Sequence, residues 1–260
     1  MKPRIVTYCL FSYVLIAITF LLIHPAGAET MVQSNVDSRT IVALQVSTPA
    51  LQKWLPKGWL INTAAQGPFK DANLLVIFMD RPYAVDASGK PSSTGNERFV
   101  VLVVPVANPK SDKPTYMVIG GYSTNPKEIP GPYKNFVKAS IRRVQTFEGN
   151  DMEFGMGDDA WTVQIGGTGT IELRFRHQRS TPARSKVEQH IYSSIDPGFF
   201  RIYRVDNTMD LIKSVPISVD RLQNYQFNVK VPELQDMFDG NEKFVALVAQ
   251  PLYARQVFLP

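Results

Sequence analysis

The sequence predicts a mainly β protein, built as an antiparallel barrel or sandwich with a few short helices. Apolar runs of strand length recur along most of the chain. One central segment has the alternation and the glycine-rich turn of a β-hairpin. The chain also lacks the regular succession of strands and long helices that a parallel α/β sheet requires.

The first 28 residues have the pattern of an export signal. Lys2 and Arg4 precede an almost unbroken apolar run over residues 5–23, and Ala26-Gly27-Ala28 matches the small residues that signal peptidase accepts. We therefore expect cleavage after Ala28 and a periplasmic or secreted mature protein that forms a single β-rich domain over residues 29–260.

A retained membrane anchor is the alternative, because roughly 20 apolar residues are enough to span a bilayer. Pro25 and the Ala-Gly-Ala site favour cleavage. Later apolar runs are interrupted by charges or prolines, so we expect no stable membrane insertion after the signal is removed.

Cysteine and charge exclude several classes of function. The only cysteine, Cys9, lies in the signal, so the mature chain has no disulfide, thiolate nucleophile or thiolate metal ligand. Removing Lys2 and Arg4 lowers the formal net charge from +5 to +3. The remaining basic residues are scattered, with no basic stripe of the kind that nucleic-acid binding requires.

The strands can be placed from their apolar runs and the helices from their start signals. Residues 29–38 are polar and predict a flexible start, and residues 48–55 predict a short helix with Thr48 as N-cap and Pro49 in its first turn. A second short helix is expected over residues 232–238, and residues 82–96 have the composition of a long polar loop. Ile41, Ala43 and Val46 lie in a β-like stretch, and strands are expected over residues 72–79, 99–106, 116–122, 199–205, 225–231 and 244–249.

The clearest local prediction is the central hairpin. Trp161, Val163 and Ile165 alternate with polar residues, residues 166–169 make the turn, and Ile171, Leu173 and Phe175 alternate with charged residues. The charged face should meet solvent or a polar cavity.

Familiar catalytic and metal-binding motifs are absent from the sequence. There is no Gly-x-Ser-x-Gly elbow and no phosphate-binding loop with its lysine. His177 is expected at the surface of a hairpin strand, and Asp158-Asp159 is expected in a turn. We predict no metal and no cofactor, which leaves Lys, Glu, Asp, Arg and Tyr as available catalytic groups.

Two segments resemble the acetoacetate decarboxylase-like superfamily. Residues 50–58, Ala-Leu-Gln-Lys-Trp-Leu-Pro-Lys-Gly, are similar to the short helix followed by Leu-Pro-x-Gly near the start of those proteins. Residues 128–135, Glu-Ile-Pro-Gly-Pro-Tyr-Lys-Asn, resemble the family's Glu-Ile/Leu-x-Gly-Tyr-Pro-Lys-Lys segment. The resemblance covers residues 40–145 and implies a closed, mostly antiparallel β-barrel with a double-layered sheet around a small-molecule cavity.

The resemblance also implies site residues. Lys134 matches the lysine that forms a Schiff base with a β-keto acid, a reaction that requires the neutral amine and an apolar pocket or a nearby cation. Glu97 lies at a separation from Lys134 comparable with that of the family's carboxylate that positions the substrate, and Tyr133 is a candidate for substrate binding. Apart from the resemblance, Arg81 ends an apolar strand, where a cation at the barrel mouth could hold a substrate carboxylate. Lys138 competes with Lys134 if the register shifts. The structural alternatives are a solvated loop lysine for Lys134, a surface pair for Glu97 and Arg98, and a structural role for Arg81.

Three functions follow as hypotheses. The first is an exported barrel that binds a small carbonyl or carboxylate compound, with decarboxylase or other lyase chemistry if Lys134 is catalytic. The second is a non-catalytic periplasmic binding protein, which Asn135 favours because it replaces the family's second lysine. The third is a cell-envelope interaction protein, which should show an exposed apolar patch. Whether the protein is an enzyme stays open, an oligomer is allowed, and no nucleic-acid partner is expected.

Overall fold

The computed structural model describes residues 29–92, 95–108, 115–127, 131–167 and 169–260. Residues 31–259 form one compact unit. The proposed signal over residues 1–28 lies outside the described ranges. No helix in the described part of the chain is long and apolar enough to cross a bilayer.

Strands account for most of this unit, as the sequence predicts. The helical segments are α2 (Thr48–Gln52) and the 3₁₀ turns η1 (Gly131–Tyr133) and η2 (Pro232–Leu234). The strands are β1 (Thr30–Gln45), β2 (Leu60–Ile61), β3 (Leu74–Asp86), β4 (Glu97–Ala107), β5 (Thr115–Ser123), β6 (Phe136–Glu148), β7 (Met156–Ile165), β8 (Gly169–Gln178), β9 (Ala183–Ser193), β10 (Phe200–Ser214), β11 (Val219–Asp220), β12 (Leu222–Lys230) and β13 (Lys243–Leu259).

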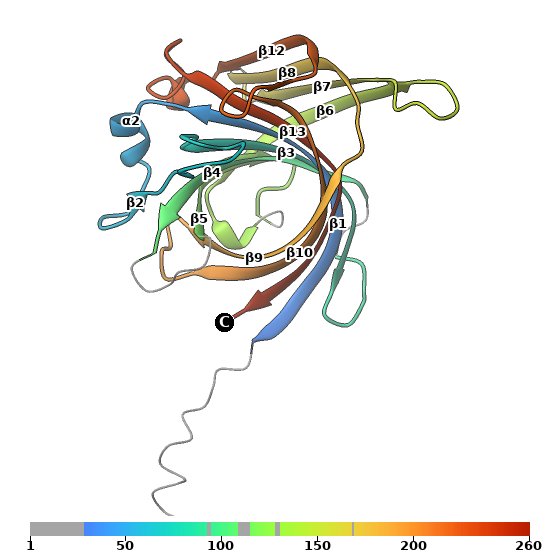
Figure 1. Cartoon of the computed structure of the whole chain (residues 1–260). Helices are drawn as coiled ribbons and strands as arrows, with labels where there is room; N and C mark the ends of the chain where they lie inside the picture. The colour runs from blue at the N-terminus through green and yellow to red at the C-terminus, as the bar shows by residue number, and fades with distance from the viewer. Residues whose placement is uncertain (1–28, 93–94, 109–114, 128–130, 168) are drawn as a thin grey trace, which may run out of the picture. The chain divides into compact units, whose positions relative to one another are not determined.

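Seven of these strands close into a barrel. They follow the order β5-β9-β10-β13-β1-β3-β4, and a further pairing between β4 and β5 closes the ring. Figure 1 shows this ring, with the turn that contains η1 inside its outline. The predicted mainly β, closed barrel is therefore confirmed, although the sheet is mixed, because β5 runs parallel to both β6 and β9.

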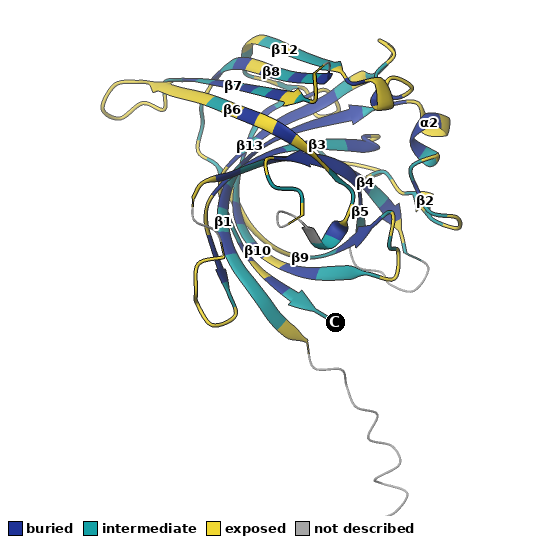
Figure 2. Cartoon of the chain, turned by 180° about the vertical axis from the view of Figure 1, so that it is seen from behind, coloured by how far each residue is buried: buried dark blue, intermediate teal, exposed yellow. Residues whose placement is uncertain are grey.

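The second layer is the antiparallel sheet β6-β7-β8-β12, which branches from β5 (Figure 2). Thr115–Val118 of β5 pair with β9, whereas Gly121–Ser123 pair with β6. At the change of partner the ring of Phe136 lies directly against Gly121, where a Cβ would overlap it. One strand thus joins the barrel to the second layer.

An apolar core fills the space between the two layers. Strand alternation directs Phe78 of β3 towards Trp161 of β7 and Phe227 of β12, with ring centroids 5.5 Å and 6.5 Å apart. Ile171 and Leu173 of β8 are completely buried beside them. The predicted hairpin and its apolar face are therefore confirmed, since Trp161 pairs with Leu173 and Val163 pairs with Ile171.

Several local expectations are wrong. Residues 30–38 are not a flexible start but the first part of β1, and β3 continues to Asp86 into the predicted loop. Ser47, not Thr48, is the N-cap of the first helix, because its Oγ accepts a hydrogen bond of 3.4 Å from Ala50 N. The second expected helix is only the turn η2.

Candidate functional site

The barrel interior contains a cavity of about 150 Å³. Apolar side chains from β3, β4 and β5 form one side of it, among them Met79, Val101 and Val118. The polar part of its wall is strongly cationic, because four arginines on four different strands line it: Arg39, Arg81, Arg201 and Arg255.

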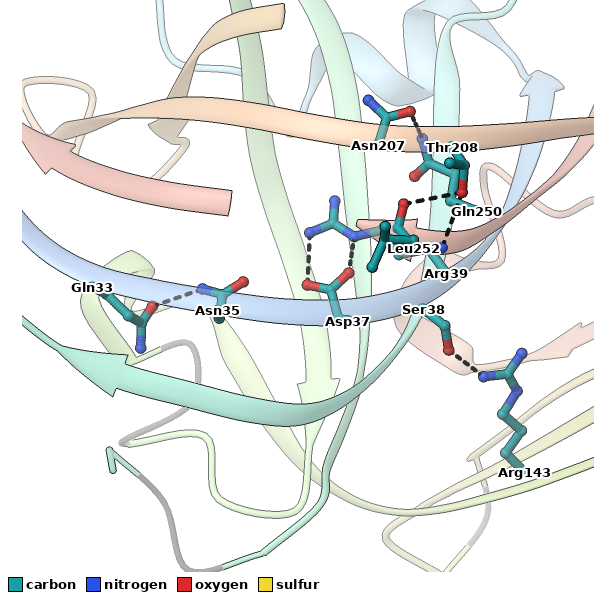
Figure 3. A network of polar contacts seen from close by, with 10 residues as sticks. All are labelled: Gln33, Asn35, Asp37, Ser38, Arg39, Arg143, Asn207, Thr208, Gln250 and Leu252. Carbon is teal, nitrogen blue, oxygen red and sulfur yellow. Dashed lines mark hydrogen bonds and ion pairs between the residues drawn. The ribbon is translucent and has the colours of Figure 1, made fainter. Parts of the chain in front are cut away.

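Two of these arginines are neutralised by carboxylates. Asp37 forms a bidentate pair with Arg39 along β1, and the bond from Arg39 Nη2 to Asp37 Oδ2 is 3.0 Å long (Figure 3). Glu97 accepts a hydrogen bond from Arg81 and pairs with it in the β3–β4 register. Burial is the largest influence on the pKa of Arg39 and lowers it, but Asp37, Tyr253 and Tyr203 together outweigh burial and the pKa is raised. For Arg81, burial dominates over Glu97 and the pKa is lowered.

The other two arginines have no carboxylate partner among the described residues. The Nε atoms of Arg201 and Arg255 are both buried without a hydrogen-bond acceptor. The guanidinium carbon of Arg255 lies 4.2 Å from the centroid of the Tyr203 ring. Because a buried, unpaired cation is costly, this wall of the cavity favours an anionic ligand.

A pair of phenols lies beside these two cations. The hydroxyl groups of Tyr133 and Tyr203 are 2.6 Å apart, and both residues line the cavity. Ser193 holds the η1 turn in place, because its Oγ donates a 2.7 Å hydrogen bond to the carbonyl of Tyr133. Burial, with the contribution of Tyr203, raises the pKa of Tyr133 well above its usual value. Tyr133 is therefore a neutral phenol, and a hydrogen bond between the two hydroxyl groups uses one hydrogen.

The structure brings three of the four residues singled out from the sequence to this cavity. Arg81 and Tyr133 line it, and Glu97 reaches it through Arg81. Glu97 is 6 % exposed, so it is not part of a surface pair with Arg98.

Lys134 lies elsewhere. Its side chain is 67 % exposed, and Nζ is 3.3 Å from a carboxylate oxygen of Asp196. No lysine is present among the described residues that line the cavity, and Lys138 is exposed on β6. The surroundings of Lys134 are not the apolar pocket that Schiff-base chemistry requires.

Sequence reasoning missed Arg39, Arg201, Tyr203 and Arg255. The signal that could have revealed them is the alternation of side chains along a strand. Arg201, Tyr203 and Val205 are spaced two residues apart on β10, so all three lie on its interior face. Reading that signal required knowing which face of β10 is the interior.

His177 and Asp159 also differ from expectation. His177 is 4 % exposed rather than a surface residue, and Asp159 lies within β7 rather than in a turn. Asp159 accepts hydrogen bonds from Arg143 Nε at 3.0 Å and Nη2 at 2.8 Å. Among the described residues, no cluster of three or more His, Cys, Asp or Glu side chains forms a candidate metal site.

Comparison with known proteins identifies the fold. No family model and no curated protein matches the sequence. Among solved structures, the enduracididine biosynthesis enzyme MppR complexed with pyruvate has a TM-score of 0.55 and 9 % identity, covering 91 % of each chain. An acetoacetate decarboxylase-like enzyme from Sphingomonas wittichii RW1 has a TM-score of 0.52 and 10 % identity, covering 91 % of this chain and 94 % of the other.

The acetoacetate decarboxylase from Legionella pneumophila subsp. pneumophila str. Philadelphia 1 is similar over 94 % of this chain and 93 % of its own, with a TM-score of 0.50 and 11 % identity. The predicted acetoacetate decarboxylase-like fold is thus confirmed. At these identities the likeness concerns the fold, and function has to be argued from the side chains.

Proposed function

We propose that this protein binds a small carboxylate non-covalently in the barrel cavity, with a 2-oxo acid such as pyruvate as the best-fitting class. The observation that carries the proposal is the pair of cavity-lining arginines, the buried Arg255 and the partly buried Arg201, whose Nε atoms are both buried without an acceptor. Planar guanidinium groups match the geometry of a carboxylate, and they gain the charge partner that the fold does not supply.

The phenol pair accounts for the carbonyl oxygen of the ligand, next to the carboxylate that the arginines bind. When one hydroxyl of Tyr133 and Tyr203 donates to the other, one hydroxyl hydrogen is left to donate to a carbonyl oxygen. A 2-oxo acid presents its carbonyl directly beside its carboxylate. The pyruvate complex of MppR supports this class, because that enzyme has the same fold.

A Schiff-base lyase is the second candidate, and the names of the structural neighbours favour it. It would require Lys134 to leave Asp196 and enter the cavity.

We further propose that the protein is exported and cleaved after Ala28, on the basis of the sequence of residues 1–28. The mass of the mature chain tests this.

Titration calorimetry with three related compounds tests the binding proposal. Pyruvate should bind more tightly than propanoate, which lacks the carbonyl, and acetone should not bind, because it lacks the carboxylate. Arg255→Gln should weaken pyruvate binding at least about tenfold, since losing one partner of a buried charge pair costs about 2–5 kcal/mol. Arg204→Gln is the matched control, because Arg204 lies on the same strand but is exposed and ion-paired with Glu188.

Borohydride treatment in the presence of pyruvate separates the two candidates. Non-covalent binding predicts an unmodified chain mass, whereas a reduced adduct on Lys134 would show Schiff-base formation and favour the lyase candidate. Equal pyruvate affinity in Arg255→Gln and the unsubstituted protein would contradict the binding proposal.

A further inference from the structure

A second cavity, of about 300 Å³, lies between the barrel and the inner face of β6, β7 and β8. We call it the inter-sheet cavity. The space between the layers is apolar around Trp161 but becomes polar further along the same strands, where Arg143, Asp159 and His177 line the cavity. Apart from Arg39, its lining residues differ from those of the barrel cavity.

Two buried polar atoms of this lining have no hydrogen-bond partner among the described residues. They are His177 Nδ1 and Gln250 Oε1, on side chains that are 4 % and 8 % exposed. Gln250 is oriented by its Nε2, which donates to Asn207 Oδ1 at 3.3 Å (Figure 3). A buried oxygen that accepts no hydrogen bond costs free energy. A ligand in this cavity would therefore gain by donating a hydrogen bond to Gln250 Oε1.

His177 can complement the same donor group. Burial is the main cause that lowers the pKa of His177, so the imidazole is neutral near pH 7. A neutral imidazole has one donor and one acceptor nitrogen, and a hydroxyl group can serve either of them. Gly157 makes room for the ring, since a Cβ there would lie 2.8 Å from His177 Cε1.

The charges of the lining leave one cation in excess. Arg143 is paired with Asp159, and Asp210 with Arg221. Arg179, in contrast, has no carboxylate partner in the described part of the chain; its Nη1 donates only to the carbonyl of Phe154, at 3.3 Å. This excess favours an acidic group on the ligand.

Aromatic rings form part of the walls. Phe175 is buried next to His177, with ring centroids 5.3 Å apart, whereas Phe147 and Phe154 are 55 % and 44 % exposed. The guanidinium carbon of Arg179 lies 4.2 Å from the centroid of Phe147. Exposed rings beside a partly covered cation are suited to contact a planar, apolar ligand body.

We propose that the inter-sheet cavity is a second binding site, which takes a small aromatic acid bearing a hydroxyl group. The acidic group binds Arg179, the ring packs against Phe147 and Phe154, and the hydroxyl donates to Gln250 Oε1 beside His177. The proposal is independent of the carboxylate function of the barrel cavity, because it rests on different polar groups.

Calorimetry with 4-hydroxybenzoate on the full mature chain tests it. Benzoate lacks the donor and 4-hydroxybenzamide lacks the charge, so each should bind at least about tenfold more weakly, the loss expected for one hydrogen bond to a charged or buried group. Arg179→Gln should weaken 4-hydroxybenzoate to a similar extent. Arg176→Gln should not, because Arg176 pairs with Glu148 and Asp158.

Competition with pyruvate assigns the site. If 4-hydroxybenzoate binds the inter-sheet cavity, a saturating concentration of pyruvate and the Arg255→Gln substitution should leave its affinity unchanged. Absence of binding by 4-hydroxybenzoate, equal affinity for all three compounds, or binding that is insensitive to Arg179→Gln would each overturn the proposal. In that event ordered water is the partner of His177 and Gln250.

Discussion

At the residue scale, two local arrangements neutralise arginines in the barrel: Asp37 pairs with Arg39 along β1, and Glu97 pairs with Arg81 across β3 and β4. Glu97 lies directly opposite Arg81 in the β3–β4 pairing. On β10, Val205 lies opposite Arg255, and on β9, Ile191 lies opposite Arg201. Neither of these pairings supplies a carboxylate, so Arg201 and Arg255 lack the cross-strand partner that Arg81 has.

His177 gives a pH prediction at the same scale. Its pKa is lowered in the folded protein from an ordinary value of 6.5, mainly by burial, so the unfolded chain binds more protons below that pH. The free energy of unfolding should therefore fall as the pH drops from about 7 to about 5. Urea denaturation across this range should show a steeper loss in the unsubstituted protein than in His177→Gln, whose amide does not titrate. Parallel pH profiles would contradict this.

At the element scale, the predictability of a strand depended on which kind of residue covers its buried face. The hairpin β7–β8 was predicted because its inner face is apolar and alternates with polar residues. β1 was missed in its first half because its polar side chains, Asn35, Asp37 and Arg39, are buried. A strand that faces a polar cavity has the composition of a loop, so composition alone could not reveal it.

The point on β5 where its parallel partner changes from β9 to β6 gives a prediction about stability. A Cβ at Gly121 would overlap the ring of Phe136 and the carbonyl oxygen of Val100, whereas at Gly120 it would have only an ordinary contact, 3.5 Å from the carbonyl of Asn135. Gly121→Ala should therefore lower the free energy of unfolding by about 1–3 kcal/mol or more, the cost of overpacking.

Gly120→Ala is the matched control, since it adds the same methyl group to the adjacent residue. It should change the unfolding free energy much less, as measured by urea denaturation. Equal losses in the two variants would mean that close packing of Phe136 does not fix the branch point.

At the scale of the whole molecule, the site comes from residues far apart in the chain. Arg39, Arg81, Arg201 and Arg255 meet only because the barrel closes, and sequence spacing does not encode that closure. Of the site residues chosen from the sequence, Arg81, Glu97 and Tyr133 lie at the cavity, but Lys134 does not. Because a motif fixes neighbours along the chain, it cannot determine the direction in which one side chain leaves a turn.

The shared core between the layers predicts that the barrel and the second sheet unfold together. Phe78 belongs to the barrel, yet its ring packs against Trp161 and Phe227 of the second sheet. Leu173→Ala, at a completely buried position of β8, should cost about 2–5 kcal/mol. Hydrogen exchange followed by mass spectrometry should show an equal loss of protection in the most protected peptides of β7–β8 and of β10–β13, because two-state unfolding exposes both.

Val103→Ala provides the reciprocal test from inside the barrel, where Val103 is 6 % exposed and does not contribute to the core between the layers. It should also lower protection equally in both sets of peptides, although by a smaller amount, since fewer buried carbon atoms are removed. If Leu173→Ala increases exchange only in β7–β8, the second sheet unfolds on its own. The inter-sheet cavity would then open without the barrel, and the two cavities would be thermodynamically separate.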